Sequence, residues 1–194
     1  MTTAAKSNGK VTNRIADIEP LAIAIPAPKF QVVSIKIRGT APYVQNKFAD
    51  SAVQEMREKQ EKGSQANKGK KREAKDFDAH YKSSMHVTDK GKHGIPCSAF
   101  RAAMIDACRL VDFHMTNAKQ VIRILSDAIS TGGDPLVLIK GTPKMFVSPV
   151  PQGQTTDLRS RARFDDWSCV VRIESDVDRL SPSDIASLLM RAGM

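Results

Sequence analysis

The sequence predicts an α+β fold, because segments with a strand pattern and segments with a helix pattern alternate along its 194 residues. Residues 30–38 (FQVVSIKIR) place an apolar side chain at every second position, as a strand with one buried face does. Residues 98–112 and 182–192 repeat apolar side chains at helical intervals. We therefore expect one folded α+β domain over residues 29–194, preceded by a mobile arm over residues 1–28.

The expected helices follow from periodicity and capping residues. Asp50 is an N-cap candidate, and Ser181, Pro182 and Asp184 form the N-terminal pattern of a helix. Helices are expected over residues 48–62, 98–112, 116–130 and 182–192.

The expected strands are short and are separated by Gly and Pro. They cover residues 30–38, 136–140, 144–148, 158–164 and 167–174, with a loop over residues 149–157. Between the first two helices the chain becomes polar and basic, so a flexible basic insertion is expected at about residues 63–94. A hairpin or irregular loop is expected at its end, around residues 86–93.

The element order indicates an antiparallel sheet with packed helices. Strand 30–38, helix 98–112, two strands and helix 182–192 follow the βαββα order that begins a ferredoxin-like, RRM-like fold. The last strand of that fold has no counterpart after Gly193. We therefore expect an exposed sheet edge, which invites pairing with another chain, unless an earlier hairpin takes its place.

The charge of the chain is large and unevenly placed. Thirty Lys and Arg face 21 Asp and Glu, a net charge of +9. Residues 1–94 carry 18 of the basic and 10 of the acidic side chains, so the excess lies almost wholly in that half. A concentrated basic segment is typical of proteins that bind phosphate backbones, and also of solvated loops.

Cysteine usage and hydropathy indicate the compartment. The three cysteines lack CxxC spacing and suit a reduced environment. The sequence has no 18-residue apolar run and no signal-peptide pattern, so we expect a cytoplasmic protein without membrane partners.

An alternation of arginines is the strongest candidate for a binding surface. On a strand, Arg159, Arg161 and Arg163 point the same way, roughly 6.6–6.8 Å apart, and could contact successive phosphates. The alternative is an exposed face that pairs with Asp157, Asp165 and Asp166. The other candidate contacts are Lys36, Arg38, Lys47, Lys70, Lys71, Arg72 and Arg101.

Base stacking and catalysis have weaker support. Only 5% of residues are aromatic, Tyr43 being the best stacking candidate, so we expect backbone tracking rather than base readout. No cofactor and no metal are expected, because the four histidines lack ligand spacing. Asp165 and Asp166 leave a metal-dependent nuclease open as an alternative.

Three segments resemble a known family: IKIRGTAPYVQNKF, GIPCSAFRAAMIDACR and FDDWSCVVRIESDVDRLSPSDIASLLMRAGM. They are similar to small phage-encoded proteins, and through these to the Cas7-like, or RAMP, branch of the ferredoxin-like fold. The family's helix start facing RNA matches Pro96, Ser98, Phe100 and Arg101. The glycine-rich loop and final strand usual in that family do not follow Gly193.

The expected function is noncatalytic binding of nucleic acid, with a single strand favoured. The resemblance further implies self-assembly into homo-oligomers. The alternative is a phage structural, assembly or inhibitor protein that binds a protein partner.

Overall fold

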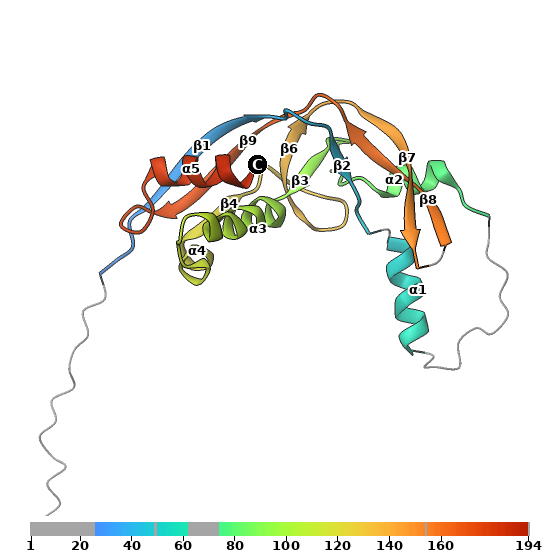
Figure 1. Ribbon diagram of the computed structural model, residues 1–194, viewed down its shortest axis with the longest axis horizontal. Coiled ribbons are helices and arrows are strands. Elements are labelled where there is room, and N and C mark those ends of the chain that lie inside the picture. Colours follow the sequence, from blue (N-terminus) through green and yellow to red (C-terminus); the bar gives the residue numbers. More distant parts are fainter. Residues whose placement is uncertain (1–25, 49, 62–73, 154, 194) are drawn as a thin grey trace, which may run out of the picture.

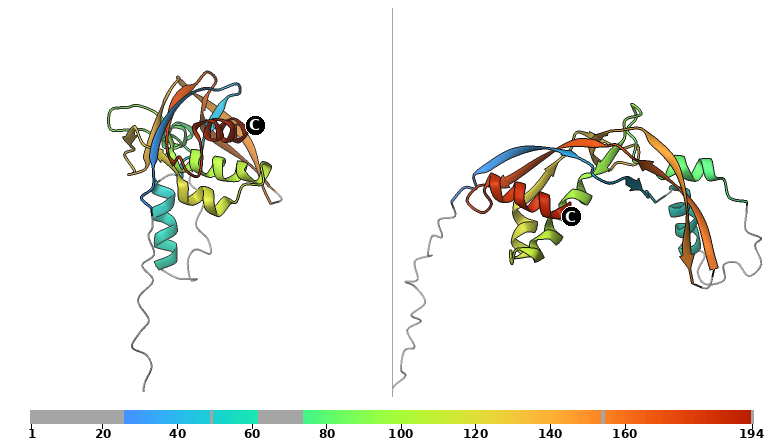
Figure 2. Two further views of the ribbon diagram at one scale, coloured as in Figure 1. Left: turned by 90° about the vertical axis from the view of Figure 1, so that its left-hand side faces the viewer. Right: turned by 45° about the horizontal axis from the view of Figure 1, so that its top comes forward.

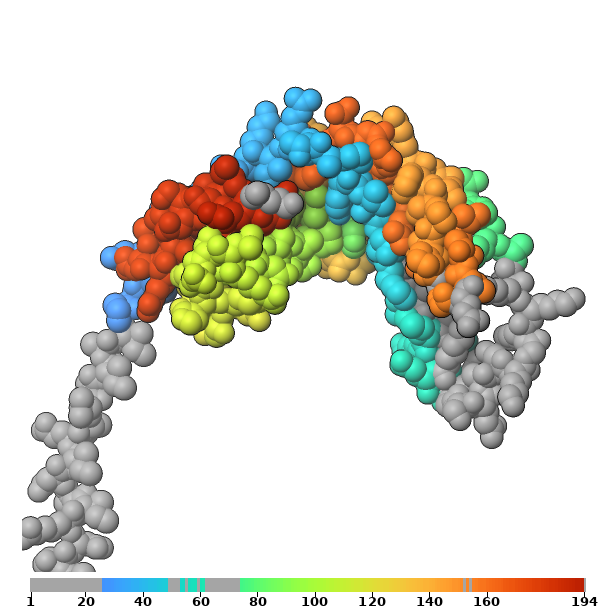
Figure 3. Space-filling view, in the orientation of Figure 1, coloured from blue at the N-terminus to red at the C-terminus, as the bar shows by residue number. Residues whose placement is uncertain are grey.

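The computed structural model describes residues 26–48, 50–61, 74–153 and 155–193, and within these ranges the chain is α+β with antiparallel sheets. The elements form an arch (Figure 1). A large sheet with helices α3 (Cys97–Ala107), α4 (Met115–Val121) and α5 (Pro182–Ala192) makes one side. A long hairpin with helices α1 (Asp50–Glu61) and α2 (Phe77–Ser83) makes the other. Figure 3 shows the open underside between the two.

The large sheet has six strands, all paired antiparallel. They are β1 (Phe30–Arg38), β3 (Gly94–Pro96), β4 (Ile122–Leu125), β5 (Ala128–Ile129), β6 (Pro135–Lys140) and β9 (Ser168–Asp176). The order is β1-β9-β6-β3, with β4 paired to β9 and β5 paired to β6. Strand β9 is therefore central, and β1 lies at an edge.

Alternation along β1 and β9 separates a buried face from an outer face. Val171 and Ile173 are fully buried, and Ile35 and Ile37 pack against the same core. Helices α3 and α5 cover this inner face, and the rotated view in Figure 2 also places them on one side of the sheet. The outer face is not covered by any described helix, since Val32 and Val170 are 48% and 47% exposed.

The hairpin arm consists of β7 (Pro143–Gln152) and β8 (Thr155–Phe164), which pair over ten positions. The short strand β2 (Tyr43–Gln45) pairs with the other side of β8. Helix α2 lies against β8, where the Ser160 hydroxyl donates to the carbonyl of Phe77 at 2.6 Å. Phe164 is fully buried where the arm meets the large sheet, in ring contact with Tyr43 and His93.

Most predicted elements are confirmed. The strand over 30–38, the helices beginning near 50, 98 and 182, and the turn around 86–93, closed by a bridge between Val87 and His93, are present. A capping box joins Ser181 and Asp184 at the start of α5. Helix α2 and strand β2 were not predicted; Asp76 caps α2 by accepting bonds from the backbone of Asp78 and Ala79.

The helix expected over 116–130 is wrong in its second half. Helix α4 ends at Val121, and β4 and β5 follow. Ile122 and Ile124 are buried while Arg123 is exposed, which is the alternation of a strand. The β-branched residues at 121, 122 and 124 favour this conformation over a helix.

The loop expected over 149–157 is also wrong, because β7 continues through two prolines. Proline disrupts a strand only where its missing N–H would bond to the neighbouring strand. The amide of Ala162 and the carbonyl of Leu158 bond to groups outside β7, to the Ser84 hydroxyl and the Lys75 ammonium. The backbone N–H and C=O groups of the β7 residues paired with them therefore point away from β8. The prolines lie an even number of positions from those residues, so their nitrogens also point away from β8. Pro143, Pro149 and Pro151 thus lie where no donor is needed.

Several sequence-based expectations concern residues outside the described ranges. The arm expected over residues 1–28 lies there except for its last three residues, and so do Lys70, Lys71 and Arg72. Within the described part of the chain, no helix is long and apolar enough to cross a membrane.

Candidate nucleic-acid interface

The outer face of the large sheet carries a group of basic residues. Lys36 and Arg38 lie two positions apart on β1 and are both exposed. Arg38 and Lys140 flank Ser168 on neighbouring strands, since both residues are in register with it. Strand spacing puts the Cα atoms of Lys36 and Arg38 about 6.6–6.8 Å apart, and neighbouring strands lie about 4.8 Å apart. The basic residues therefore form a compact patch over three strands.

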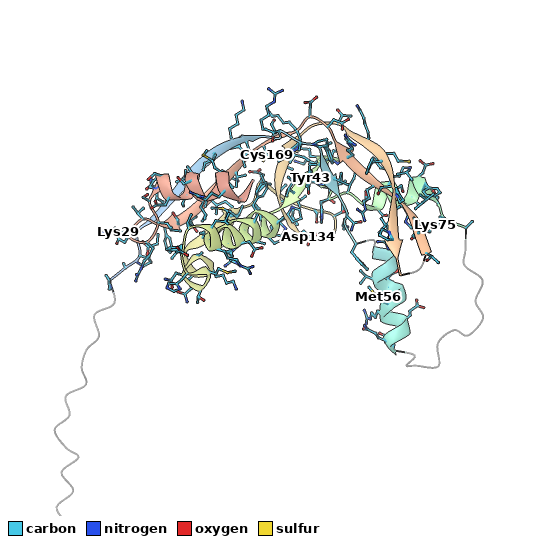
Figure 4. All side chains as sticks on the ribbon, viewed as in Figure 1. Lys29, Tyr43, Met56, Lys75, Asp134 and Cys169 are labelled. Atoms are coloured by element: carbon cyan, nitrogen blue, oxygen red, sulfur yellow. The ribbon has the colours of Figure 1, made fainter. Side chains whose placement is uncertain are left out.

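A depression of about 540 Å³ lies within this patch. Its cationic residues are Lys36, Lys92 and Lys140. Leu138 and Val170 contribute apolar surface, and His93 also lines the depression. In Figure 4 the labelled Cys169, which also lines the depression, lies near the crest of the arch. We call Lys36, Arg38, Lys92 and Lys140, with this depression, the outer basic face.

The cations of the outer basic face have no acidic partner among the described residues. Among the residues that the structure describes, none of the four has a carboxylate oxygen within 4.0 Å. The one acidic residue that lines the depression is Asp127. One of its oxygens accepts from Arg172 at 2.9 Å and the other from the backbone of Leu138 at 2.9 Å. Asp127 is thus paired with Arg172 and not with any of the lysines.

Burial keeps the two titratable groups beside the lysines neutral. Desolvation lowers the pKa of His93, and its Nδ1 is buried without a hydrogen-bond partner. Burial, reinforced by the nearby Asp127, raises the pKa of the Cys169 thiol to about 11. The positive charge of the depression therefore comes from lysine and does not depend on pH near neutrality.

The arginine row differs from this face, because most of it is paired inside the protein. Arg159, Arg161 and Arg163 share one face of β8, opposite the face that α2 covers. Arg163 donates to Asp165 at 2.7 Å and lies over the ring of Phe146, 5.2 Å from its centroid. Arg159 lies 3.7 Å from Asp157. The structure thus pairs these two arginines with Asp157 and Asp165, which is the alternative that the sequence left open.

Arg161 is the exception in the row. No described carboxylate lies within 4.0 Å of its guanidinium, and its Nε is buried without a hydrogen-bond partner. Its Cα partner on β7 is Phe146. Arg161 is therefore the member of the row whose charge is not balanced by any described carboxylate.

Lys47 lies inside a polar cluster at the junction. Its ammonium is so close to Gly132 that a β-carbon there would lie 3.3 Å from it. Burial lowers the pKa of the nearby His86, and the charge of Lys47 acts in the same direction. Asp134, with an oxygen 3.5 Å from His86 Nδ1, opposes the shift. Lys47 therefore lies beside the turn at residues 130–134 and not on the outer basic face.

Arg101 points toward the helix layer. Its Nε donates to the carbonyl of Ile122 at 3.1 Å, and its Nη2 donates to the carbonyl of Lys119. It therefore caps the C-terminal end of α4, where a cation is favourable. The structure does not bring it to the outer basic face.

Asp165 and Asp166 lack a third potential metal ligand among the described residues. Asp165 is bonded to Arg163 and Lys144, and these hydrogen bonds hold its pKa below its ordinary value. The described residues contain no group of three or more His, Cys, Asp or Glu side chains that could hold a metal ion. The geometry thus gives the nuclease alternative no support.

Sequence reasoning missed Lys92, His93 and Lys140. The alternation of β6, with Val137 and Ile139 buried, places Lys140 outward, so this residue could have been found. Lys92 and His93 reach the face through a turn, for which periodicity has no signal. Tyr43, the expected stacking residue, instead packs against Phe164 and Trp167.

No protein-family model and no curated protein matches this chain.

Proposed function

We propose that this protein binds nucleic acid noncatalytically, holding a single strand by its phosphates along the outer basic face. The observation that carries the proposal is a group of four cations on one sheet face, on which the described residues place neither a carboxylate partner nor a covering helix. A protein that holds cations unpaired on one surface keeps their full attraction for phosphates. The net charge of +9 adds a long-range attraction of the same sign.

The proposal includes a ferredoxin-like core of the Cas7-like kind. Its support is the order β1-β9-β4, with α3 following β1 and α5 following β9 on the same face of the sheet. Proteins with that sheet commonly present its uncovered face to nucleic acid. Arg161 on the arm would extend the path of the strand beyond the sheet.

Charge reversal on the outer basic face tests the proposal. Lys36→Glu combined with Lys140→Glu should lower the affinity for a single-stranded oligonucleotide by about tenfold or more at low salt. The control is the exposed Lys119 on α4, reversed alone and together with the exposed Lys82 on α2. Equal losses in the test and the double control would mean that only total charge matters, and would contradict the assignment to this face.

A second candidate is a protein-binding role, for which the specific observation is the edge of β1 that no described strand covers. Gly39 N–H donates to Trp167, and Val177 N–H donates to Lys29, so the odd positions of β1 bond to β9. The amides of the even positions therefore face the open side. Proline occupies the corresponding positions of β7 but none in β1. An edge of this kind accepts a strand from a second copy or a related subunit.

The edge has its own test. Ser34→Pro removes one outward amide of β1 without touching a β1–β9 bond. If copies of the chain join through this edge, the variant should be smaller than the wild type by sedimentation at the same concentration. Unchanged oligomers would exclude the edge, as would a wild type that is already monomeric.

A further inference from the structure

The depression on the outer basic face combines two kinds of surface. Lys36, Lys92 and Lys140 supply positive charge, while Leu138 and Val170 supply apolar surface. Its volume of about 540 Å³ falls in the range of about 300–1,000 Å³ typical of small-molecule sites. A simple phosphate contact needs cations alone, so the apolar part requires another explanation.

The ring of His93 makes the depression suitable for a planar group. Its edge-on contact with Phe164, at 5.5 Å between centroids and 67° between planes, fixes its orientation. The low pKa of His93 keeps the imidazole neutral, and neutral imidazole is a stacking partner for nucleobases. Its Nδ1 is buried without a described hydrogen-bond partner.

The shape of the site depends on Gly141, at the junction of β6 and β7. Its φ of +152° is unfavourable for other residues, and a β-carbon there would lie 2.6 Å from the carbonyl oxygen of Asp166. Only glycine permits this close approach of the two chain segments, so this wall of the depression is a defined feature of the fold.

We infer that the depression holds one nucleobase of a bound single strand, with the flanking phosphates on Lys36, Lys92 and Lys140. This inference rests on the proposed function and deepens it, because binding then depends on bases as well as on phosphates. It requires a single strand, since the bases of a duplex are stacked and paired. Stacking of this kind tolerates any base, so affinity depends little on sequence.

The test compares two probes with the same phosphates. The wild-type protein is titrated with single-stranded oligothymidylate and with a strand of equal length whose nucleotides are all abasic, at several salt concentrations. The intact strand should bind about tenfold or more tightly, with the same salt dependence. Equal affinities would overturn the base site and leave the phosphate interface standing. Failure of both strands to bind would overturn the proposed function itself.

A filling variant locates the effect. Val170→Met should reduce the affinity for the intact strand toward that for the abasic strand, while the abasic strand binds as before. Val32→Met is the matched control, because Val32 is an equally exposed valine of the outer face, outside the depression. If the two variants lower the preference for the intact strand equally, or if neither lowers it, the base does not lie in this depression.

Discussion

The outer basic face and the arginine row of the arm are both positively charged, but their charges are held differently. The four cations of the outer basic face have no described carboxylate within reach. On the arm, Arg159 and Arg163 are paired with Asp157 and Asp165, as Lys144 is with Asp165. Arg161 differs from these three, because no carboxylate of the described residues lies within 4.0 Å of it. The density of basic residues along the chain therefore does not measure the charge available to a ligand.

The difference arises from how each surface is built. The arm is a hairpin whose acidic residues sit within two positions of the arginines, so local pairs form readily. The outer basic face is assembled from β1, β6 and the turn before β3, which are far apart in sequence. Figure 4 shows Lys29 and Lys75 near opposite ends of the arch, where each pairs with an aspartate. Other exposed cations, such as Lys82 and Lys119, also have no described carboxylate within 4.0 Å, so the grouping of its four cations is what distinguishes the outer basic face.

The largest expected effect concerns the core that both surfaces share. Phe164→Ala should lower the free energy of unfolding by about 3–5 kcal/mol, because it removes a fully buried ring at the junction. Phe146→Ala, which removes a half-buried ring from the same hairpin, should cost less. Urea unfolding measures both. Equal losses of unfolding free energy would contradict a special contribution of Phe164 to the junction between the two sides of the arch.

Removing the acidic partner of Arg163 and Lys144 tests whether pairing reduces the charge that the arm offers to a ligand. Asp165→Asn frees Arg163 and Lys144, so it should raise the affinity for a single strand by about threefold to tenfold at low salt. Asp166→Asn makes the same charge change at the neighbouring exposed residue, which has no described ion pair, and should have a smaller effect. Binding titrations that give the same increase for both variants would argue against pairing as the cause.

Single arginine truncations give a smaller effect. Arg161→Ala should weaken binding by about threefold, whereas Arg159→Ala should change it little because Arg159 already lies beside Asp157. Fluorescence anisotropy at low salt measures the difference. The reverse ranking would mean that pairing in the free protein does not decide which arginine meets the ligand.

The smallest effect is a titration. The hydrogen bonds from Lys144 and Arg163 should keep the pKa of Asp165 below its ordinary 3.8, and Lys144→Ala should move it back toward that value. Because the folded pKa is lowered, this pair stabilises the fold above pH 3.8, and the contribution is lost as the pH falls through the folded pKa. A carboxyl chemical-shift titration by NMR follows the group directly. If the pKa of Asp165 in the wild type lies at its ordinary value, these hydrogen bonds do not form in solution.

Much of the fold could be predicted because local patterns and tertiary structure agree. The alternation in β1 and the Ser181–Asp184 capping box are local signals that the packing keeps. Residues 122–129 were predicted as a helix because their apolar spacing suits either a helix or short strands. Pairing with β9 and β6 makes them strands. The prolines in β7 predict a loop from sequence alone, because the sequence does not show that β7 is an edge strand.

The site was less predictable, since it depends on contacts between distant segments. Lys36 and Arg38 could be assigned to an outward face from alternation alone. Nothing local shows that Arg101 caps α4 or that Lys47 belongs to the Gly132 turn. The pairing state of each cation is likewise a tertiary property, so the sequence alone does not show that Arg159 and Arg163 are paired.

The most direct test of the account is the salt dependence of single-strand binding for two multiple variants. One replaces Lys36, Arg38, Lys92 and Lys140 by Ala, and the other replaces Arg159, Arg161 and Arg163. Each lost phosphate contact lowers the slope of log affinity against log salt by about 0.7. We predict a decrease of about 2–3 for the first variant and of about 0.7 for the second. Equal decreases, or a larger one for the arginine variant, would contradict the assignment of the interface to the outer basic face.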